Sequence, residues 1–387
     1  MRPAMKSIRF KSALLILGAL LFAPNAQGVP VPDSTLQASL AGANLNAVDL
    51  DAALLPPALT VQAAPEFRAA TLLGLTLDGN ELRLAPGASV GVLESAPIAA
   101  SAPFTELLPS WNAAAPGGWL SLEVRAQVGS RWTKYYSFGR WSNGATRSSL
   151  NGQGDGDGDV QTDVLKLKRP ATRLQYRLTL HGAAGSGPEV RLVTFTATGK
   201  ANAASARAVP SAAWSRVLNV PTRSQMQFPQ GEGWCSPTSV SMVLAYWGKN
   251  VTVPQAAAGT FDAAYGGTGN WAFNAAYAAS LGFTAYATRF SSLAEVERHV
   301  LVGVPVVLSV GWGKNELPNA PVPSSGGHLI VAVGFDGEGN LVVNDPAAPT
   351  NATVRRVYDR AIFERLWQSH SGGAAYVIRA GNAAAQE

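Results

Sequence analysis

The chain reads GWCSPTSVSMVLAYWG from Gly233 to Gly248. Pro237 suits the first turn of a helix and Gly248 suits a C-terminal cap, so this run predicts a helix from Cys235 to Trp247. Cys235 would then lie at the helix N-terminus, where unpaired backbone N–H groups and the helix dipole stabilise a thiolate. A free cysteine is more commonly a small buried hydrophobe. Its position at the start of a helix favours a reactive thiol over that alternative.

The N-terminus of the chain has the pattern of a secretory signal. An apolar run from Ala13 to Ala23 precedes a small-residue cleavage site at Ala26-Gln27-Gly28. The run is short for a retained membrane anchor, which is the alternative. Four basic residues precede it: Arg2, Lys6, Arg9 and Lys11. We therefore expect an exported protein, whether secreted, periplasmic or at the cell surface, with no stable membrane insertion after cleavage.

Cys235 is the only cysteine of the chain. Exported proteins usually use cysteines in disulfide-bonded pairs. A single thiol in such a protein is therefore either a residue without a functional role or a reactive group. Removing the four basic residues of the signal lowers the net charge from +5 to +1, which gives no reason to expect nucleic acid as a partner. No cofactor is indicated by any motif.

The length of 387 residues and the 47% of hydrophobic residues predict two compact domains. Short alternating runs broken by turns predict an all-β sandwich of jelly-roll type in the first half, with a two-residue hairpin turn at Gly129-Ser130. The predicted segments are a signal peptide at 1–28, a linker or pro-segment at 29–65, the sandwich at 66–199, a linker at 200–213 and a second domain at 214–382.

The second domain has an α+β order, with helices first and an antiparallel sheet last. Beyond the helix that begins at Cys235, the sequence predicts two more helices, at Trp271–Ser280 and Leu293–Val302. Strands are predicted at Val304–Val310, His328–Phe335 and Leu341–Asn344.

A thiolate nucleophile needs a base, and the chain has four histidines. His181 falls in the first domain, whereas His299 and His370 lie in charged or polar segments and are expected to be solvated. His328 follows Gly326-Gly327 and opens an apolar strand. It is therefore the candidate base.

The turn after that strand predicts a partner for His328. If Asp336-Gly337 form a two-residue turn, Phe335 pairs with Glu338 and His328 faces Asp345 across the hairpin. A wider loop through Asn340 would shift this register by three residues. Taken alone, Asp345 would be a strand-end turn residue before a proline. Facing a histidine, it would orient the imidazole and stabilise its charged form.

These motifs resemble the bacteriocin-processing, double-glycine-type peptidases and their secreted stand-alone relatives within the papain-like cysteine peptidases. The matching pieces occur in the order glutamine, cysteine, histidine and aspartate, and they read VPTRSQ from Val220, CSPTS from Cys235, GHLIVAVGF from Gly327 and VNDP from Val343. No P-loop accompanies them, so the resemblance does not extend to an exporter or to cleavage after double glycine.

The resemblance implies an exported cysteine peptidase with an α+β papain-like fold and a peptide or protein substrate. Cys235 would attack a carbonyl, His328 would transfer the proton, Asp345 would hold the imidazole and Gln225 would donate into the oxyanion hole. Gln227 and Gln230 compete for the last role. The alternatives are a degenerate papain-fold binding protein and an acyl or peptidyl transferase that uses the same thioester chemistry.

Two weaker signals lie in the first domain. Alternate aspartates resemble a calcium loop but lack the glutamate of an EF-hand, so a solvated turn is favoured over a metal. These candidates are Asp155, Asp157, Asp159 and Asp163. Seven aromatic residues would suit a cell-surface polysaccharide, although aromatic side chains in alternating strands more commonly form the core. They are Trp111, Trp119, Trp132, Tyr135, Tyr136, Phe138 and Trp141.

Overall fold

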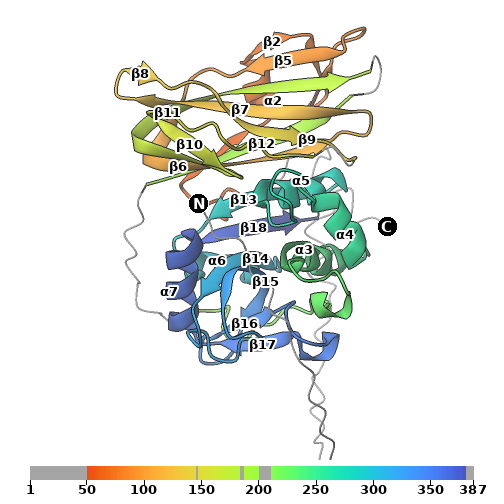
Figure 1. Ribbon diagram of the computed structural model, residues 1–387, viewed down its shortest axis with the longest axis vertical. Coiled ribbons are helices and arrows are strands. Elements are labelled where there is room, and N and C mark those ends of the chain that lie inside the picture. The colour runs from red at the N-terminus through yellow and green to blue at the C-terminus, as the bar shows by residue number, and fades with distance from the viewer. Residues whose placement is uncertain (1–49, 145–146, 184–186, 200–210, 381–387) are drawn as a thin grey trace, which may run out of the picture. The chain divides into compact units, whose positions relative to one another are not determined.

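The computed structural model describes residues 50–144, 147–183, 187–199 and 211–380. The described residues group into one compact unit. Figure 1 shows a strand-rich N-terminal half and a C-terminal half in which helices pack on a second sheet. The predicted signal peptide lies outside the described residues, as does most of the predicted linker 200–213. In the part of the chain that the structure describes, no helix has the length and hydropathy needed to span a membrane.

From Leu50 to Thr198, the described residues of the N-terminal half are all-β apart from one short helix, α2 (Ala64–Arg68). Its strands are β1 (Leu59–Gln62), β2 (Thr71–Leu73), β3 (Leu75–Asp78), β4 (Glu81–Leu84), β5 (Val90–Glu94), β6 (Ile98–Ala114), β7 (Gly118–Val128), β8 (Arg131–Trp132), β9 (Tyr136–Trp141), β10 (Gly158–Gln161), β11 (Val164–Gly182) and β12 (Glu189–Thr198). They pair in the order β2-β5-β11-β6-β12-β4-β3, and β7 pairs with β8, β9 and β11.

Two strand-like runs of alternating residues in this half are interrupted. The run from Thr71 divides at Gly74, whose φ of 64° is suited to glycine, into β2 and β3. The run from Arg131 divides into β8 and β9, because the hydroxyl of Thr133 accepts a hydrogen bond of 3.0 Å from the backbone N–H of Ala126 at that point. The hairpin at Gly129-Ser130 is confirmed, since Val128 pairs with Arg131.

The segment 29–65 was expected to be a linker or pro-segment, and its described end contains a strand. Leu59 to Gln62 form β1, which pairs antiparallel with β12. Leu55 and Leu59 also pack against the core of the C-terminal half. This part of the segment is therefore built into the fold, because its apolar side chains and backbone groups find partners on both halves.

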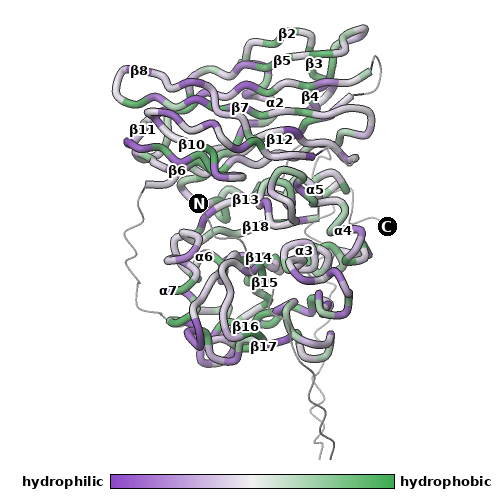
Figure 2. The backbone as a smooth tube through the Cα atoms, in the orientation of Figure 1, coloured by the Kyte–Doolittle hydropathy of each residue, from purple (hydrophilic) through white to green (hydrophobic). Residues whose placement is uncertain are grey.

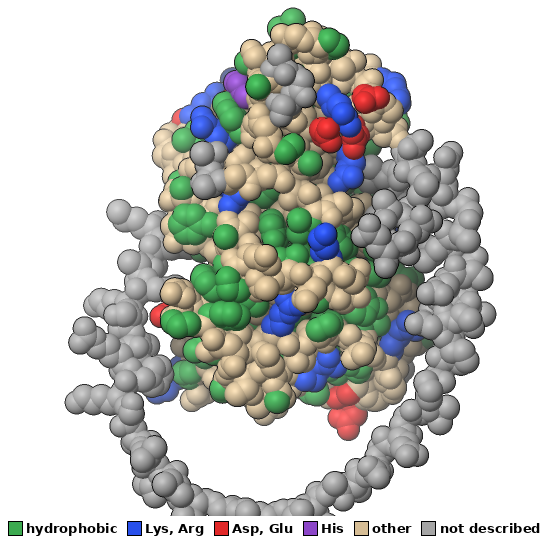
Figure 3. All heavy atoms as spheres, turned by 90° about the vertical axis from the view of Figure 1, so that its right-hand side faces the viewer, with side chains coloured by type: hydrophobic (Ala, Val, Ile, Leu, Met, Phe, Trp, Pro, Cys, Tyr) green, Lys and Arg blue, Asp and Glu red, His purple; other side chains and the backbone are tan. Residues whose placement is uncertain are grey.

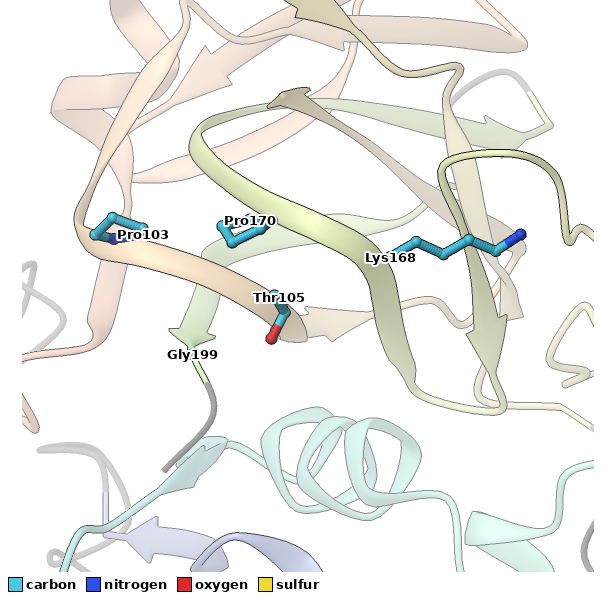
Figure 4. Close-up of a pocket in the computed structure, with 5 residues that line it drawn as sticks. All are labelled: Pro103, Thr105, Lys168, Pro170 and Gly199. Carbon is cyan, nitrogen blue, oxygen red and sulfur yellow. The ribbon is translucent and has the colours of Figure 1, made fainter. Parts of the chain in front are cut away.

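The long strands β6 and β11 change partners along their length. Residues 173–182 of β11 pair with β7, and residues 177–181 also pair with β5. The pairing of β11 with β6 involves Leu165, Lys166, Ala171, Arg173 and Leu174. A cavity of about 480 Å³ lies where both strands bend, and Figure 4 shows its lining. The lining residues are Pro103, Thr105, Lys168, Pro170 and Gly199. The alternation of polar and apolar residues along β7, visible in Figure 2, points its apolar face into the core of this half.

The C-terminal half contains a six-stranded antiparallel sheet in the order β13-β18-β14-β15-β16-β17. The strands are β13 (Thr284–Arg289), β14 (Val306–Trp312), β15 (Ser325–Phe335), β16 (Leu341–Asn344), β17 (Arg355–Tyr358) and β18 (Ala374–Arg379). The helices are α3 (Cys235–Tyr246), α4 (Val253–Thr260), α5 (Trp271–Ser280), α6 (Leu293–Leu301) and α7 (Arg360–Ser371), with short 3-10 turns at η1 (Gln225–Gln227) and η2 (Asn351–Thr353). The predicted helices and strands of this half are confirmed to within a few residues.

Helix α3 is buried on all sides, which fits its nearly uninterrupted apolar and small side chains. The hydroxyl of Ser239 donates a 3.0 Å hydrogen bond to the carbonyl of Leu329 and so joins α3 to β15. Gly248, with a φ of 87°, lets the chain turn away after the helix, as the sequence predicted.

The two halves share buried side chains. The ring centroid of Phe273 in α5 lies 5.5 Å from that of Trp141 and 6.1 Å from that of Trp111, both in the core of the all-β half. The side-chain amide of Asn112 in β6 donates to the carbonyl of Ala285 and accepts from its N–H at 3.0 Å, and so it pairs with the edge of β13. On the face in Figure 3, basic side chains are spread over the surface, and some near the top lie beside acidic ones.

Candidate active site

Cys235 is the first residue of α3, as predicted, and its side chain is buried. Burial alone raises the pKa of a thiol, because it disfavours the charged form. A hydrogen bond and the charge of His328 oppose this effect, as do backbone N–H groups of Leu329 and Ser236, and the pKa of Cys235 lies below its ordinary value. The surroundings therefore stabilise the thiolate.

His328 lies in β15, and its ring is only 4% exposed. Its Nε2 atom is 2.7 Å from Oδ1 of Asp345, which leaves Nδ1 for the thiol. Burial lowers the pKa of a histidine, but the Asp345 carboxylate and the Cys235 thiolate outweigh it and raise the pKa of His328 well above its ordinary value. The edge of the Trp312 indole packs against the imidazole, with ring centroids 5.7 Å apart. The ring is held in one orientation, in its charged form.

Asp345 is fully buried directly after β16. Its Oδ1 atom also accepts the backbone N–H of Ala347 at 3.0 Å, and its Oδ2 atom accepts the hydroxyl of Tyr358 at 2.6 Å. Burial raises the pKa of a carboxyl group, but His328 and these donors outweigh it and keep the pKa of Asp345 below its ordinary value. Tyr358 was not predicted as a site residue, because no local sequence motif marks it.

The register argument that led to Asp345 was wrong, although the two side chains do meet. Phe335 pairs with Leu341, so the turn is the wider loop through Asn340. The carboxylate of Asp336 stabilises this loop by accepting the N–H groups of Glu338 at 2.9 Å and Asn340 at 2.8 Å. A register shift between Ala332 and Gly334 reduces this offset by one residue and leaves His328 not directly opposite Asp345. Asp345 therefore reaches His328 from beyond the end of β16.

Gln225 begins η1 and is buried, whereas the competing Gln227 and Gln230 are exposed. Its backbone N–H donates to the carbonyl of Pro346 at 2.9 Å, which ties this segment to the Asp345 loop. Its side-chain Nε2 donates to the carbonyl of Gly231 at 3.0 Å. One amide hydrogen of Gln225 is left for another acceptor.

The other three histidines lie on other elements, although His370 approaches Gly327, the residue before His328. His370 is exposed on α7, and His181 stacks on Trp119 in the all-β half with ring centroids 3.6 Å apart. His299 was expected to be solvated, but it is fully buried, and its Nδ1–H donates to the carbonyl of Glu295 at 2.8 Å. The prediction failed because α6 is buried on more than one face, and Glu295 and Glu297 are themselves buried with partners.

The aspartates of the candidate calcium loop have other partners. Asp155 accepts the hydroxyl of Tyr136 at 2.6 Å, and Asp157 pairs with Arg131 at 2.5 Å. Asp163 accepts the backbone N–H of Trp271 at 2.6 Å, away from that loop. Among the residues that the structure describes, no three histidine, cysteine or acidic side chains are grouped to hold a metal ion.

The aromatic residues of the all-β half divide between core and surface. Four of them are buried: Trp111, Tyr136, Phe138 and Trp141. Trp119, Trp132 and Tyr135 are half-buried on the surface, where arginines cover them. The guanidinium of Arg140 lies 4.1 Å from the Trp119 ring centroid, and that of Arg177 lies 4.3 Å from the Tyr135 ring centroid. Cations thus cover rings that a sugar would need to reach.

Comparison with known families gives one match for each half. Residues 66–199 match the Peptidase C39 N-terminal domain, and residues 217–375 match the Peptidase C39 like family. No curated protein matches the chain.

Two solved structures are similar to part of the chain. One is a crystal structure assigned as a C39-like peptidase from Bacillus anthracis, with 20% identity, a TM-score of 0.33, and coverage of 43% of this chain and 98% of that one. The other is a double glycine motif protease from an AMS/PCAT transporter in complex with the leader peptide, with 20% identity, a TM-score of 0.29, and coverage of 43% and 94%. These two matches relate the C-terminal half of the chain to the C39-like peptidases and the N-terminal half to a C39 N-terminal domain, and each covers less than half of the chain.

Proposed function

We propose that the chain is an exported cysteine peptidase in which Cys235, His328 and Asp345 form a catalytic triad. One observation carries the proposal: the buried imidazole of His328 contacts the thiol of Cys235 on one side and the carboxylate of Asp345, at 2.7 Å, on the other. A nucleophile, a base and a group that orients the base are the parts that acyl transfer through a thioester requires.

In the first step the Cys235 thiolate attacks the carbonyl carbon of a peptide bond, and the π electrons move onto the carbonyl oxygen. The C–N bond then breaks as the imidazolium of His328 gives its proton to the leaving nitrogen, which leaves a thioester on Cys235. In the second step the neutral imidazole takes a proton from water as the water oxygen attacks the thioester. The carboxylic acid leaves, and the thiolate–imidazolium pair is restored.

Negative charge on the carbonyl oxygen develops only as the bond is attacked, so donors aimed at that oxygen lower the barrier. The backbone N–H of Cys235, at the start of α3, is one such donor. The free amide hydrogen of Gln225 is the second, because the other hydrogen is already bonded to Gly231. Asp345 keeps the imidazole charged and correctly turned.

The proposal includes a papain-like arrangement for residues 214–382 and a jelly-roll-like sandwich for residues 66–199. It takes a peptide or protein as the substrate and export as the location, on the strength of the basic and apolar pattern of residues 1–28.

The test uses the protein from residue 29 onward. We expect iodoacetamide to label it at Cys235 at neutral pH and a fluorogenic peptide library to yield cleaved members. Cys235→Ala should abolish both signals and His328→Ala should slow both, whereas the control His181→Ala in the all-β half should leave them unchanged. An unlabelled wild-type protein that cleaves nothing would leave a binding protein as the better description.

A further inference from the structure

The peptide group between Gly233 and Trp234, just before the nucleophile, is hydrogen-bonded at both ends. The N–H of Trp234 donates to the carbonyl of Gly231 at 2.9 Å, and that carbonyl also accepts Nε2 of Gln225 at 3.0 Å. The carbonyl of Gly233 accepts the hydroxyl of Thr268 at 2.9 Å. This one peptide therefore connects both proposed oxyanion donors, Gln225 and the start of α3, to Thr268.

Thr268 is buried in a turn that Asp262 organises. Asp262 is fully buried, and its Oδ2 atom accepts the side-chain amide of Asn270 at 2.9 Å. The carbonyl of Thr268 accepts the side-chain amide of Asn274 at 2.8 Å. The hydrogen bond from Asn270 to the buried Asp262 carboxylate and that from Asn274 to the Thr268 carbonyl favour one geometry of the turn, because another geometry would leave buried acceptors without donors.

The all-β half holds this turn from the other side. The backbone N–H of Ser149 donates to Oδ1 of Asp262 at 2.9 Å. Asp163, next to β11, accepts the N–H of Trp271 at 2.6 Å, in the first turn of α5. The turn that carries Thr268 thus lies between two anchors from the N-terminal half, one at Ser149 and one at Asp163.

We propose that Thr268 is a positioning residue of the peptidase site and that the N-terminal domain acts on catalysis by holding Thr268 in place through Asp262 and Asp163. The inference rests on the proposed function and deepens it. Thr268 fixes the peptide plane that precedes the Cys235 N–H, and with it the direction in which that N–H meets the developing oxyanion. Oxyanion donors act through placement, so a small displacement lowers the rate without weakening substrate binding.

The first experiment replaces Thr268 by Val, which keeps the shape and removes the donor, with Thr268→Ser as the matched control that keeps it. We expect kcat to fall about tenfold in the valine variant with KM nearly unchanged, because the lost contact acts on the transition state. The affinity for a short peptide aldehyde should fall by about the same factor, since its adduct with the thiol carries an oxygen in the same position. The serine variant should restore both.

Alkylation by iodoacetamide forms no oxyanion. Its rate therefore measures the reactivity of the Cys235 thiol and does not depend on the oxyanion donors. We expect Thr268→Val to be labelled at the wild-type rate. If an active wild-type enzyme and Thr268→Val have the same kcat and aldehyde affinity, or if only the melting temperature falls, the positioning role is wrong. If the wild-type protein is neither labelled nor active, the proposed function itself is wrong and the inference falls with it.

The second experiment tests the N-terminal domain. Asp163→Ala removes the anchor on α5, and Asp157→Ala removes a carboxylate of the same half that pairs with Arg131 instead. We expect the first variant to lower kcat and aldehyde affinity and the second to leave them unchanged. The combined Asp163→Ala and Thr268→Val variant should lose less than the product of the single losses, because both act through one turn. Equal kcat for the Asp163 and Asp157 variants would overturn the part assigned to the N-terminal domain.

Discussion

The hydroxyl of Tyr358 donates a 2.6 Å hydrogen bond to Oδ2 of Asp345, whose Oδ1 lies 2.7 Å from Nε2 of His328. All three side chains are buried. The carboxylate is thus fixed by donors on both oxygens, and it can turn toward the imidazole in only one way. Tyr358 extends the proposed triad by one residue on the side away from Cys235.

Tyr358→Phe should lower both stability and activity. The buried carboxylate would lose a charge-assisted hydrogen bond, for which we expect a loss of about 2 kcal/mol in the free energy of unfolding. We also expect kcat to fall by roughly fivefold, since the imidazole would be held less firmly. Urea unfolding and peptide hydrolysis measure the two effects. The matched control is Tyr176→Phe, because the Tyr176 hydroxyl is buried without a partner, and its loss should cost nothing.

Asp345→Asn keeps the shape of the side chain and removes the charge. The pKa of His328 is raised by this carboxylate, so it should fall in the variant, and the basic limb of the pH–rate profile should move to lower pH. We expect kcat to fall by at least about a hundredfold. A profile with an unmoved basic limb and a nearly unchanged kcat would show that Asp345 is merely structural.

The ion pair also makes the stability of the protein depend on pH. The folded pKa of His328 is raised, so its contribution is complete below the unfolded pKa of about 6.5 and is lost as the pH rises through the folded value. The folded pKa of Asp345 is lowered, so its contribution is present above the unfolded pKa of about 3.9 and is lost as the pH falls through the folded value. Asp345→Asn should weaken both dependences in urea unfolding measured across pH.

His328→Ala should change how labelling of Cys235 depends on pH. The imidazolium holds the thiol pKa down against burial, so its removal should raise that pKa and move the iodoacetamide rate profile to higher pH. We expect the rate at about pH 6 to fall more than tenfold, and the difference from the wild type to narrow in alkaline solution. Parallel profiles for the two proteins would mean that the imidazole does not set the thiol pKa.

His299 should destabilise the protein in acid. Burial lowers its pKa to about 4, and its Nε2 atom has no hydrogen-bond partner. The unfolded chain therefore binds a proton more readily, so stability is lost as the pH falls from about 6.5 toward 4, by up to about 3 kcal/mol.

His299→Leu removes that group and tests its effect. The difference in unfolding free energy between pH 8 and pH 4 should be smaller in the variant than in the wild type. At pH 8 the side chain at position 299 is neutral in both proteins, so that pH serves as the reference. Identical slopes in the two proteins would contradict the assignment.

Asn112→Leu should disturb the contact between the two halves. The Asn112 amide bonds both backbone groups of Ala285, and its loss would leave a buried N–H and C=O of β13 unpaired. We expect a loss of about 2–4 kcal/mol in the free energy of unfolding, measured in urea. Ser110→Ala, which removes a single bond to the N–H of Ala287, should cost less and serves as the graded control.

Much of the C-terminal half followed from local pattern. The helix at Cys235 was predictable because Pro237, Gly248 and a run of small and apolar side chains all act within one segment. The helix Trp271–Ser280 and the strand Leu341–Asn344 were correct for the same reason. His328 stood out among four histidines because it alone follows glycines and opens an apolar strand.

For His299 the local sequence pattern gave the wrong prediction. Its neighbours Glu295 and Glu297 indicated a solvated helix face, but Glu297 pairs with Arg360 at 2.6 Å and accepts Nε1 of Trp214 at 2.9 Å. Glu295 accepts the backbone N–H of Ser291. Segments distant in the sequence supply the partners that allow these charges to be buried, and a local sequence pattern cannot predict those partners.

The amino-acid sequence by itself determined the helix, the position of the lone thiol at its N-terminus and the strand that begins near the histidine, because capping residues and side-chain period act over a few neighbouring residues. Only the tertiary structure decided that Asp345 reaches His328 across a shifted register, that Tyr358 supports it and that Thr268 fixes the peptide before Cys235. Each of these depends on which segments pack together, and packing joins residues that are far apart along the chain.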